Sequence, residues 1–180
     1  MIKIVKLIVF IITFMGLVVV NAQKIEKMDT LSVQEQAIIK ISVTAATGDL
    51  AKLKNELYSG LSVGLTINQI KDMLVQLYAY AGFPRSIRSL QTFIEVLDER
   101  KAKGIIDVVG PDASLIKNDV DKYERGKKIL ENLTGVKEKE PKIGYSAFSP
   151  EIDIFLKEHL FADIFERDVL TYKQRELVTI

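Results

Sequence analysis

The sequence contains no cysteine. This absence excludes disulfide bonds, thiolate metal sites, lipid attachment at a cysteine and every thiol-based mechanism. Histidine is scarce as well, because His159 is the only one in the chain. Since no second histidine is available to complete a set of ligands, we predict neither a metal site nor a cofactor.

Neither sign of charge is in excess. The chain carries 25 Lys and Arg residues against 24 Asp and Glu residues. A balance this close gives no general attraction to polyanions, so we predict no nucleic-acid partner. With 180 residues, 48% of them hydrophobic and 27% charged, the chain suits one domain with its own core. Packing, and not cross-links, must hold that core together.

Residues 1–22 differ from the rest of the chain. Two lysines precede the apolar run Leu7–Val20, which ends at small residues and has only 14 residues. A helix that spans a bilayer needs roughly 20. The pattern is typical of a secretory signal peptide. We therefore expect cleavage after residue 22 and an exported domain over 23–180, periplasmic or secreted, with no membrane contact afterwards. The alternative is an uncleaved membrane anchor.

The part after residue 22 is predicted to be all-α, because its apolar residues recur at helical spacing between short turns. Two capping boxes mark helix starts, in which a hydroxyl is followed three residues later by a Glu or Gln: Ser32 with Glu35, and Thr66 with Gln69. Pro84 fits the first turn of another helix, where its missing N–H is tolerated. The expected helices begin near residues 31, 49, 66, 84, 113, 150 and 171.

The later segments are more polar. We expect a surface helix over 113–133, which could also lie against a second subunit, and a solvated connector over 134–148. In the helix that follows Pro150, the apolar face is expected to carry Ile152, Phe155, Leu156 and Leu160.

An internal repeat is suggested by two segments 139 residues apart. Leu31–Ile41 aligns with Leu170–Ile180, keeping the leucine, the hydroxyl cap and three aliphatic residues. Such self-similarity is typical of repeat architectures. We expect the second repeat to begin near residue 170 and to be incomplete within this sequence.

The stretches "GLTINQIKDMLVQLYAYAGFPRS" and "HLFADIFERDVLTYKQRELVTI" resemble the two halves of carboxymuconolactone decarboxylase family proteins, the group that includes the alkylhydroperoxidase D type peroxidases. The resemblance implies an all-α fold of repeated helical hairpins that assembles into homo-oligomers. It also implies either decarboxylation of a lactone acid or thiol peroxidase chemistry.

The peroxidase branch of that family uses a glutamate followed by a C-x-x-C-x-x-x-H segment. The matching positions here hold Ala37, Asp49, Lys52 and Glu56, so the thiol relay is absent. Peroxidase activity is therefore implied only by the family's name and not by the residues. Asp49 is expected to cap a helix, and Glu56 to pair with Lys52 on the surface. In the second repeat, Glu176 occupies the glutamate position, which makes it our candidate catalytic residue. A glutamate there would also suit the start of a helix.

The segment "QLYAYAGFPRSI" supplies the candidate binding residues. Tyr78 and Tyr80 lie about 200° apart around a helix, so their side chains cannot line the same side of a binding site. Arg85 follows a first-turn proline, where a cation opposes the helix dipole unless an anion compensates. We therefore predict that Arg85, with Tyr80 or Tyr78, holds a small anionic organic molecule. The alternative is that Arg85 pairs with an acidic residue across a subunit interface and the aromatic rings fill the core.

Two functional hypotheses follow. In the first, the chain is an exported carbon–carbon lyase acting on a small organic acid or lactone, with Arg85 holding a carboxylate and Glu176 moving a proton. In the second, it is a non-catalytic protein that oligomerises or binds a small ligand, because the thiol relay is absent and the second site is incomplete.

Overall fold

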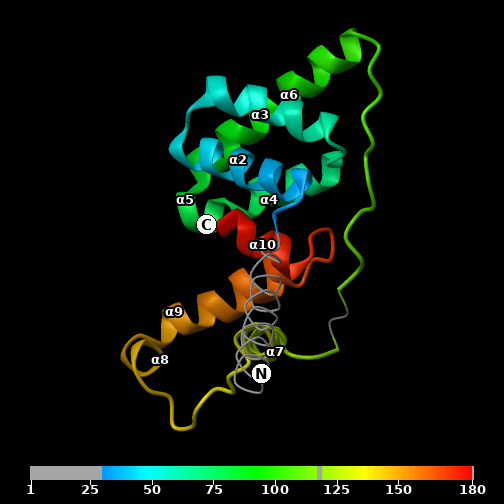
Figure 1. Ribbon diagram of the computed structural model, residues 1–180. Coiled ribbons are helices and arrows are strands. Elements are labelled where there is room, and N and C mark those ends of the chain that lie inside the picture. Colours follow the sequence, from blue (N-terminus) through cyan, green and yellow to red (C-terminus); the bar gives the residue numbers. More distant parts are fainter. Residues whose placement is uncertain (1–29, 117–118, 180) are drawn as a thin grey trace, which may run out of the picture. The chain divides into compact units, whose positions relative to one another are not determined.

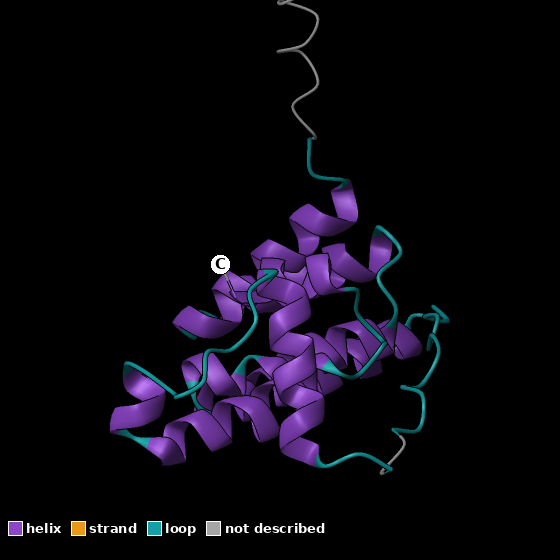
Figure 2. Cartoon of the chain, turned by 90° about the horizontal axis from the view of Figure 1, so that it is seen from below, coloured by secondary structure: helices purple, strands orange, loops and turns teal. Residues whose placement is uncertain are grey.

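The computed structural model describes residues 30–116 and 119–179 (Figure 1). Every regular element among these residues is a helix, which confirms the all-α prediction (Figure 2). The predicted signal peptide lies outside the described residues. Within the described ranges, no helix has both the length and the apolar character needed to cross a bilayer.

The chain from Ser32 onward forms one packed unit. Its first part consists of α2 (Val33–Thr47), α3 (Leu50–Ser62), α4 (Ile67–Gln76), α5 (Tyr78–Ala81) and α6 (Phe83–Ala102). A long loop leads to the second part, which consists of α7 (Lys122–Thr134), α8 (Tyr145–Phe148), α9 (Pro150–Ile154), the π-helix η1 (Phe155–Phe165) and α10 (Tyr172–Thr179).

Side-chain caps start the main helices where the sequence places them. Both predicted capping boxes are formed, at the beginnings of α2 and α4. A third capping box begins α10, where the Thr171 hydroxyl accepts from the Gln174 amide at 3.2 Å and Gln174 Oε1 accepts from the Thr171 amide at 2.9 Å. The same device thus begins both segments of the suspected repeat. The repeat itself stays a prediction.

The main core lies among α2, α3, α4 and α6. Its buried residues recur at helical spacing along these helices and include Ala37, Ile38, Ile41, Ala45, Leu53, Leu57, Leu61, Ile70, Met73, Leu74 and Leu77, while Leu50 and Ala81 are partly buried against them. α10 packs against α2 and α4 and adds Leu177 and Val178 to this core (Figure 1). Burial of this apolar surface is the main force that holds these helices together.

A buried polar network also holds α10 in place. The guanidinium of Arg175, which is 0% exposed, donates to Asp72 Oδ2 at 2.6 Å and to Gln76 Oε1 at 2.9 Å. Gln76 Nε2 donates in return to the Arg175 carbonyl at 2.8 Å, and Arg167 Nε donates to Asp72 Oδ1 at 2.6 Å. α10 therefore meets α4 through matched charges as well as through apolar contact.

A second apolar cluster lies between α7 and η1. It contains Ile129, Phe161, Ile164 and Phe165. The two helices come so close that a Cβ atom at Gly126 would overlap the backbone carbonyl of Lys157. Only glycine permits this approach.

The long loop is tied to α4 through its own backbone. The carbonyl oxygens of Val108 and Val109 accept from the first-turn amides of Ile67 and Asn68, each at 2.9 Å. Helices normally leave these amides without a partner inside the helix. The Asp107 carboxylate is held by Arg100, with an Nη2–Oδ1 distance of 2.8 Å.

The structure corrects one expectation about a helix boundary. The helix predicted over 113–133 begins only at Lys122, because Asp121 caps it by accepting from the amides of Tyr123 and Glu124. Before that point the chain is held differently, since the Ser114 amide and hydroxyl both donate to the Asp168 carboxylate. The prediction of a helix from Ala113 was therefore wrong over its first part.

The predicted apolar face after Pro150 was wrong in part. Leu156 and Leu160 are partly buried and pack against the second apolar cluster. Ile152 and Phe155 are exposed, whereas Asp153 and Lys157 are buried. Asp153 and Lys157 can be buried because their opposite charges neutralise each other. The pair therefore occupies the inner face of the helix, where hydrophobicity alone predicts Ile152 and Phe155.

Candidate functional site

Tyr78 and Tyr80 face different surroundings, as their spacing predicts. The Tyr78 ring stacks on Phe83 with a centroid distance of 4.6 Å and lies 5.3 Å from the His159 ring. Tyr80 lines a hollow of about 250 Å³ with residues of α2 and α10. Burial raises the pKa of Tyr80, and the negative charge of the nearby Glu176 raises it further. The structure therefore brings Tyr80, but not Tyr78, toward the candidate catalytic residue.

Arg85 lies against the end of α2. A Cβ atom at Gly48, which has a left-handed φ of 76°, would overlap the guanidinium of Arg85. A cation there complements the negative end of the α2 dipole. The Arg85 carbonyl accepts from the Ser89 hydroxyl at 2.8 Å. Within the described ranges the Arg85 side chain forms no hydrogen bond or ion pair, so nothing links its guanidinium directly to Glu176 or to either tyrosine.

The remaining polar candidates have local roles. Asp49 caps α3, as predicted, by accepting from the Lys52 amide. Lys52 forms an ion pair with Asp49 at 3.1 Å, so the predicted pairing of Lys52 with Glu56 was wrong. The His159 Nδ1 atom lies 2.9 Å from Asp163 Oδ2. Among the described residues, no group of His, Asp or Glu is arranged to hold a metal ion.

Sequence reasoning missed the most elaborate polar cluster, which joins α7, α9 and η1. The Tyr123 hydroxyl donates to Asp153 Oδ2 at 2.6 Å. It accepts from Lys142 Nζ at 2.6 Å and from Lys157 Nζ at 2.7 Å. Both lysines also bind the Asp153 carboxylate directly, at 2.8 Å and 2.7 Å. We call these four residues the Tyr123 cluster.

Glu138 attaches the connector to this cluster. Its Oε1 atom accepts from Lys157, and its Oε2 atom lies 3.4 Å from Lys127 Nζ. The segment 134–148 is therefore not the purely solvated connector that its composition indicates, since Glu138 and Lys142 tie it to α7, α9 and η1. After Thr134, the last residue of α7, its only regular element is α8.

The electrostatics of the cluster keep Asp153 and Lys157 ionised. Burial alone would raise the pKa of Asp153, but hydrogen bonds from Lys142, Lys157 and Tyr123 outweigh it and hold that pKa well below its usual value. Burial would lower the pKa of Lys157, yet its bonds to Asp153, Glu138 and Tyr123 together raise it. Lys157 is therefore a fixed ammonium and lacks the free amine that a nucleophilic lysine needs.

A hollow of about 430 Å³ opens beside the Tyr123 cluster. α7, the connector and η1 supply its lining, which combines apolar side chains with lysines and two glutamates: Lys127, Leu130, Glu131, Thr134, Val136, Lys137, Glu138, Lys139, Lys142, Ile143, Tyr145, Ser146 and Lys157. We call this space the lysine-lined hollow. Its size falls within the range of small-molecule sites in proteins.

Two of the lysines in the lining differ from the others. Lys127, Lys142 and Lys157 are paired with carboxylates. By contrast, Lys137 and Lys139 are exposed, and neither pairs with a carboxylate in the part of the chain that the structure describes. These two ammonium groups are free to bind an anion that enters the hollow.

The fold and site define an all-α protein with a cationic hollow. No family model matches the chain. The chain is similar to the uncharacterized protein MJ1511 of Methanocaldococcus jannaschii, with 29% identity over 65 residues, which make up 36% of this chain and 61% of the archaeal protein. The match thus spans less than two thirds of that relative, and the resemblance to carboxymuconolactone decarboxylases stays a prediction.

Proposed function

We propose that the chain binds a small organic anion in the lysine-lined hollow and acts as a binding protein. The observation that carries this proposal is the presence of two unpaired lysines, Lys137 and Lys139, in the lining of a largely apolar space. Apolar walls with a few polar groups that fix orientation are characteristic of ligand sites.

Binding is favoured over catalysis by the state of the buried groups. Lys142 and Lys157 are committed to Asp153 and Tyr123, and the raised pKa of Lys157 keeps its proton in place. A general base or nucleophile near the hollow would need a group that can change its protonation at working pH. The cluster instead supplies a rigid wall of fixed charge.

The lyase activity inferred from the resemblance stays a second hypothesis. Glu176 is exposed beside Tyr80, while Arg85 lies at the end of α2. Homo-oligomer assembly and export likewise stay predictions.

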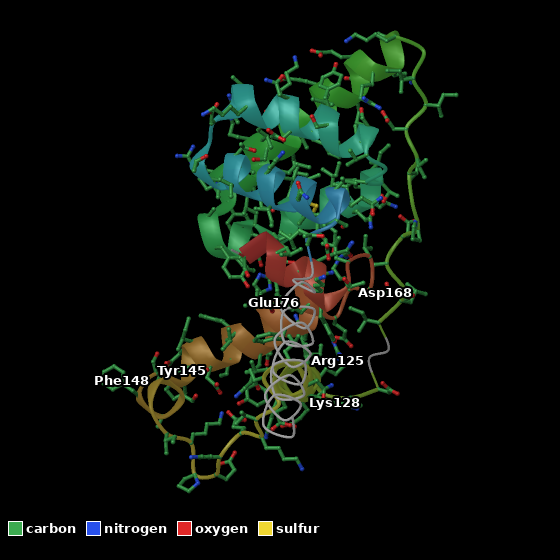
Figure 3. All side chains as sticks on the ribbon, in the orientation of Figure 1. Arg125, Lys128, Tyr145, Phe148, Asp168 and Glu176 are labelled. Carbon is green, nitrogen blue, oxygen red and sulfur yellow. The ribbon has the colours of Figure 1, made fainter. Side chains whose placement is uncertain are left out.

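Isothermal titration of the full chain with octanoate tests the binding proposal. We expect saturable binding, and a loss of at least about fivefold in affinity when Lys137→Gln and Lys139→Gln are combined, because charge-assisted contacts are lost. Lys128→Gln is the matched control, since Lys128 is an exposed lysine on α7 outside the lining (Figure 3). Octanol, which has no charge, should bind more weakly. No binding of octanoate, or equal loss in the control, would refute the proposal.

A further inference from the structure

We infer that the anion is a fatty acid, whose carboxylate lies near Lys137 and Lys139 and whose chain leaves the hollow over α8. This inference rests on the proposed function of the hollow and adds the chemical class of its ligand. It depends on an apolar surface that continues from the lining into solvent.

The apolar part of the lining is itself open. Leu130 and Val136 contribute from α7 and the start of the connector, while Ile143 and Tyr145 contribute from its end. Ile143 is 62% exposed and Tyr145 is 55% exposed. A ligand that contacts these two side chains therefore reaches the outer edge of the hollow.

The apolar surface continues onto α8. Phe148 lies three residues after Tyr145 in the same helical turn, so the two rings lie on the same side of α8. Phe148 is 93% exposed. Figure 3 shows both side chains at the corner that α8 forms, with Phe148 farther out. Ile143, Tyr145 and Phe148 thus form an apolar track that leads out of the hollow.

An extended chain fits this track better than a compact acid does. A compact aromatic acid could fill the hollow but would leave Phe148 in water, whereas an alkyl chain gains free energy from each additional methylene that it buries. Large apolar groups exposed beside a binding groove are a recognised sign of such contacts.

The charged side chains that line the hollow favour a ligand with a single negative charge. Glu131 and Glu138 lie in the lining together with the lysines. A phosphate dianion would meet these carboxylates, and Lys142 and Lys157 are already bound to Asp153. One carboxylate on the ligand matches the two unpaired lysines without requiring further cations.

An anionic bilayer is a poorer partner for the same surface. Glu140 and Glu151 are exposed on either side of the track in the sequence. Their charges oppose the approach of an anionic lipid surface, which binds proteins through clusters of basic residues. A single free acid avoids most of this repulsion.

Titration of the full chain with butanoate, octanoate and dodecanoate, each below its micelle concentration, tests the inference. We expect the affinity to rise at least about tenfold from butanoate to dodecanoate. Phe148→Ser should weaken dodecanoate binding severalfold and leave butanoate binding unchanged. Ile106→Ser is the matched control, because Ile106 is a similarly exposed apolar residue in the long loop.

The outcomes separate the two proposals. Equal affinities for all three acids, or tighter binding of benzoate than of dodecanoate, would refute the fatty-acid inference while the anion site stands. Absence of binding by every carboxylate would refute both. Binding to vesicles of anionic phospholipid that added dodecanoate does not displace would also overturn the inference, in favour of a membrane partner.

Discussion

Lys157 and Asp153 form an ion pair inside the protein, one helical turn apart at the junction of α9 and η1. Their Nζ–Oδ1 distance is 2.7 Å, and the two side chains are 1% and 0% exposed. Removing two charges from water is costly unless further hydrogen bonds satisfy them. Tyr123, Lys142 and Glu138 supply those bonds. The pair therefore anchors the wall of the lysine-lined hollow.

Asp153→Asn should destabilise the protein strongly. The change leaves Lys157 buried without its main counter-charge, and breaking a buried pair in this way costs about 3–5 kcal/mol. Urea unfolding followed by circular dichroism measures the loss. Asp163→Asn is the control, because Asp163 is 40% exposed in its pair with Lys122, and its loss should cost at most about 1 kcal/mol. Equal effects of the two changes would contradict the proposed importance of burial.

The contribution of Asp153 should depend on pH. Its pKa is lower in the folded protein than in the unfolded chain. The stabilisation is therefore fully present above the unfolded pKa of about 3.9 and is lost as the pH falls toward the folded pKa. Urea unfolding from pH 6 to pH 2 should show the gap between wild type and Asp153→Asn narrowing below about pH 4. A gap that is constant over this range would show that the carboxylate charge is not responsible.

Gly126→Ala should destabilise the contact between α7 and η1. In most helix interiors this substitution stabilises by up to about 1 kcal/mol. Here the added Cβ would overlap the Lys157 carbonyl, so the helices must move apart. We therefore expect Gly126→Ala to lower the midpoint of thermal unfolding in scanning calorimetry, whereas the same change in most helices raises it. An unchanged or higher midpoint would mean that the backbones are less close than the structure places them.

Arg175→Lys should weaken the attachment of α10 although it keeps the charge. A lysine cannot reach Asp72 and Gln76 together, because it lacks the planar fork of a guanidinium. Loss of these buried bonds should cost at least about 2 kcal/mol in urea unfolding. Arg88→Lys is the comparison, since Arg88 makes one 3.3 Å bond to Gln91 on the surface. Its effect should stay within about 0.5 kcal/mol.

Much of the first part of the fold follows from local sequence signals. The caps at Ser32, Asp49 and Thr66 and the apolar stripes of α2, α3 and α4 are short-range patterns, and the structure contains all of them. Local hydrogen bonding and helical spacing suffice to predict such features.

The lysine-lined hollow could not be predicted in the same way. Its polar wall depends on Tyr123, Lys142 and Lys157 meeting Asp153, and Tyr123 and Asp153 are 30 residues apart in the sequence. Apolar periodicity assigned Phe155 to the interior, because charges are normally excluded from cores. The i, i+4 spacing of Asp153 and Lys157 was the one local signal of a pair, and such spacing is common on exposed helix faces as well.

The backbone bonds from Val108 and Val109 to the start of α4 have an evolutionary consequence. Since carbonyl oxygens make these contacts, exchanging the side chains at either position leaves the bonds in place. Inserting or deleting a residue there would instead shift the acceptors away from the amides of Ile67 and Asn68. Among homologues, the residue types at positions 108 and 109 should therefore vary, while the number of residues in this part of the loop stays constant.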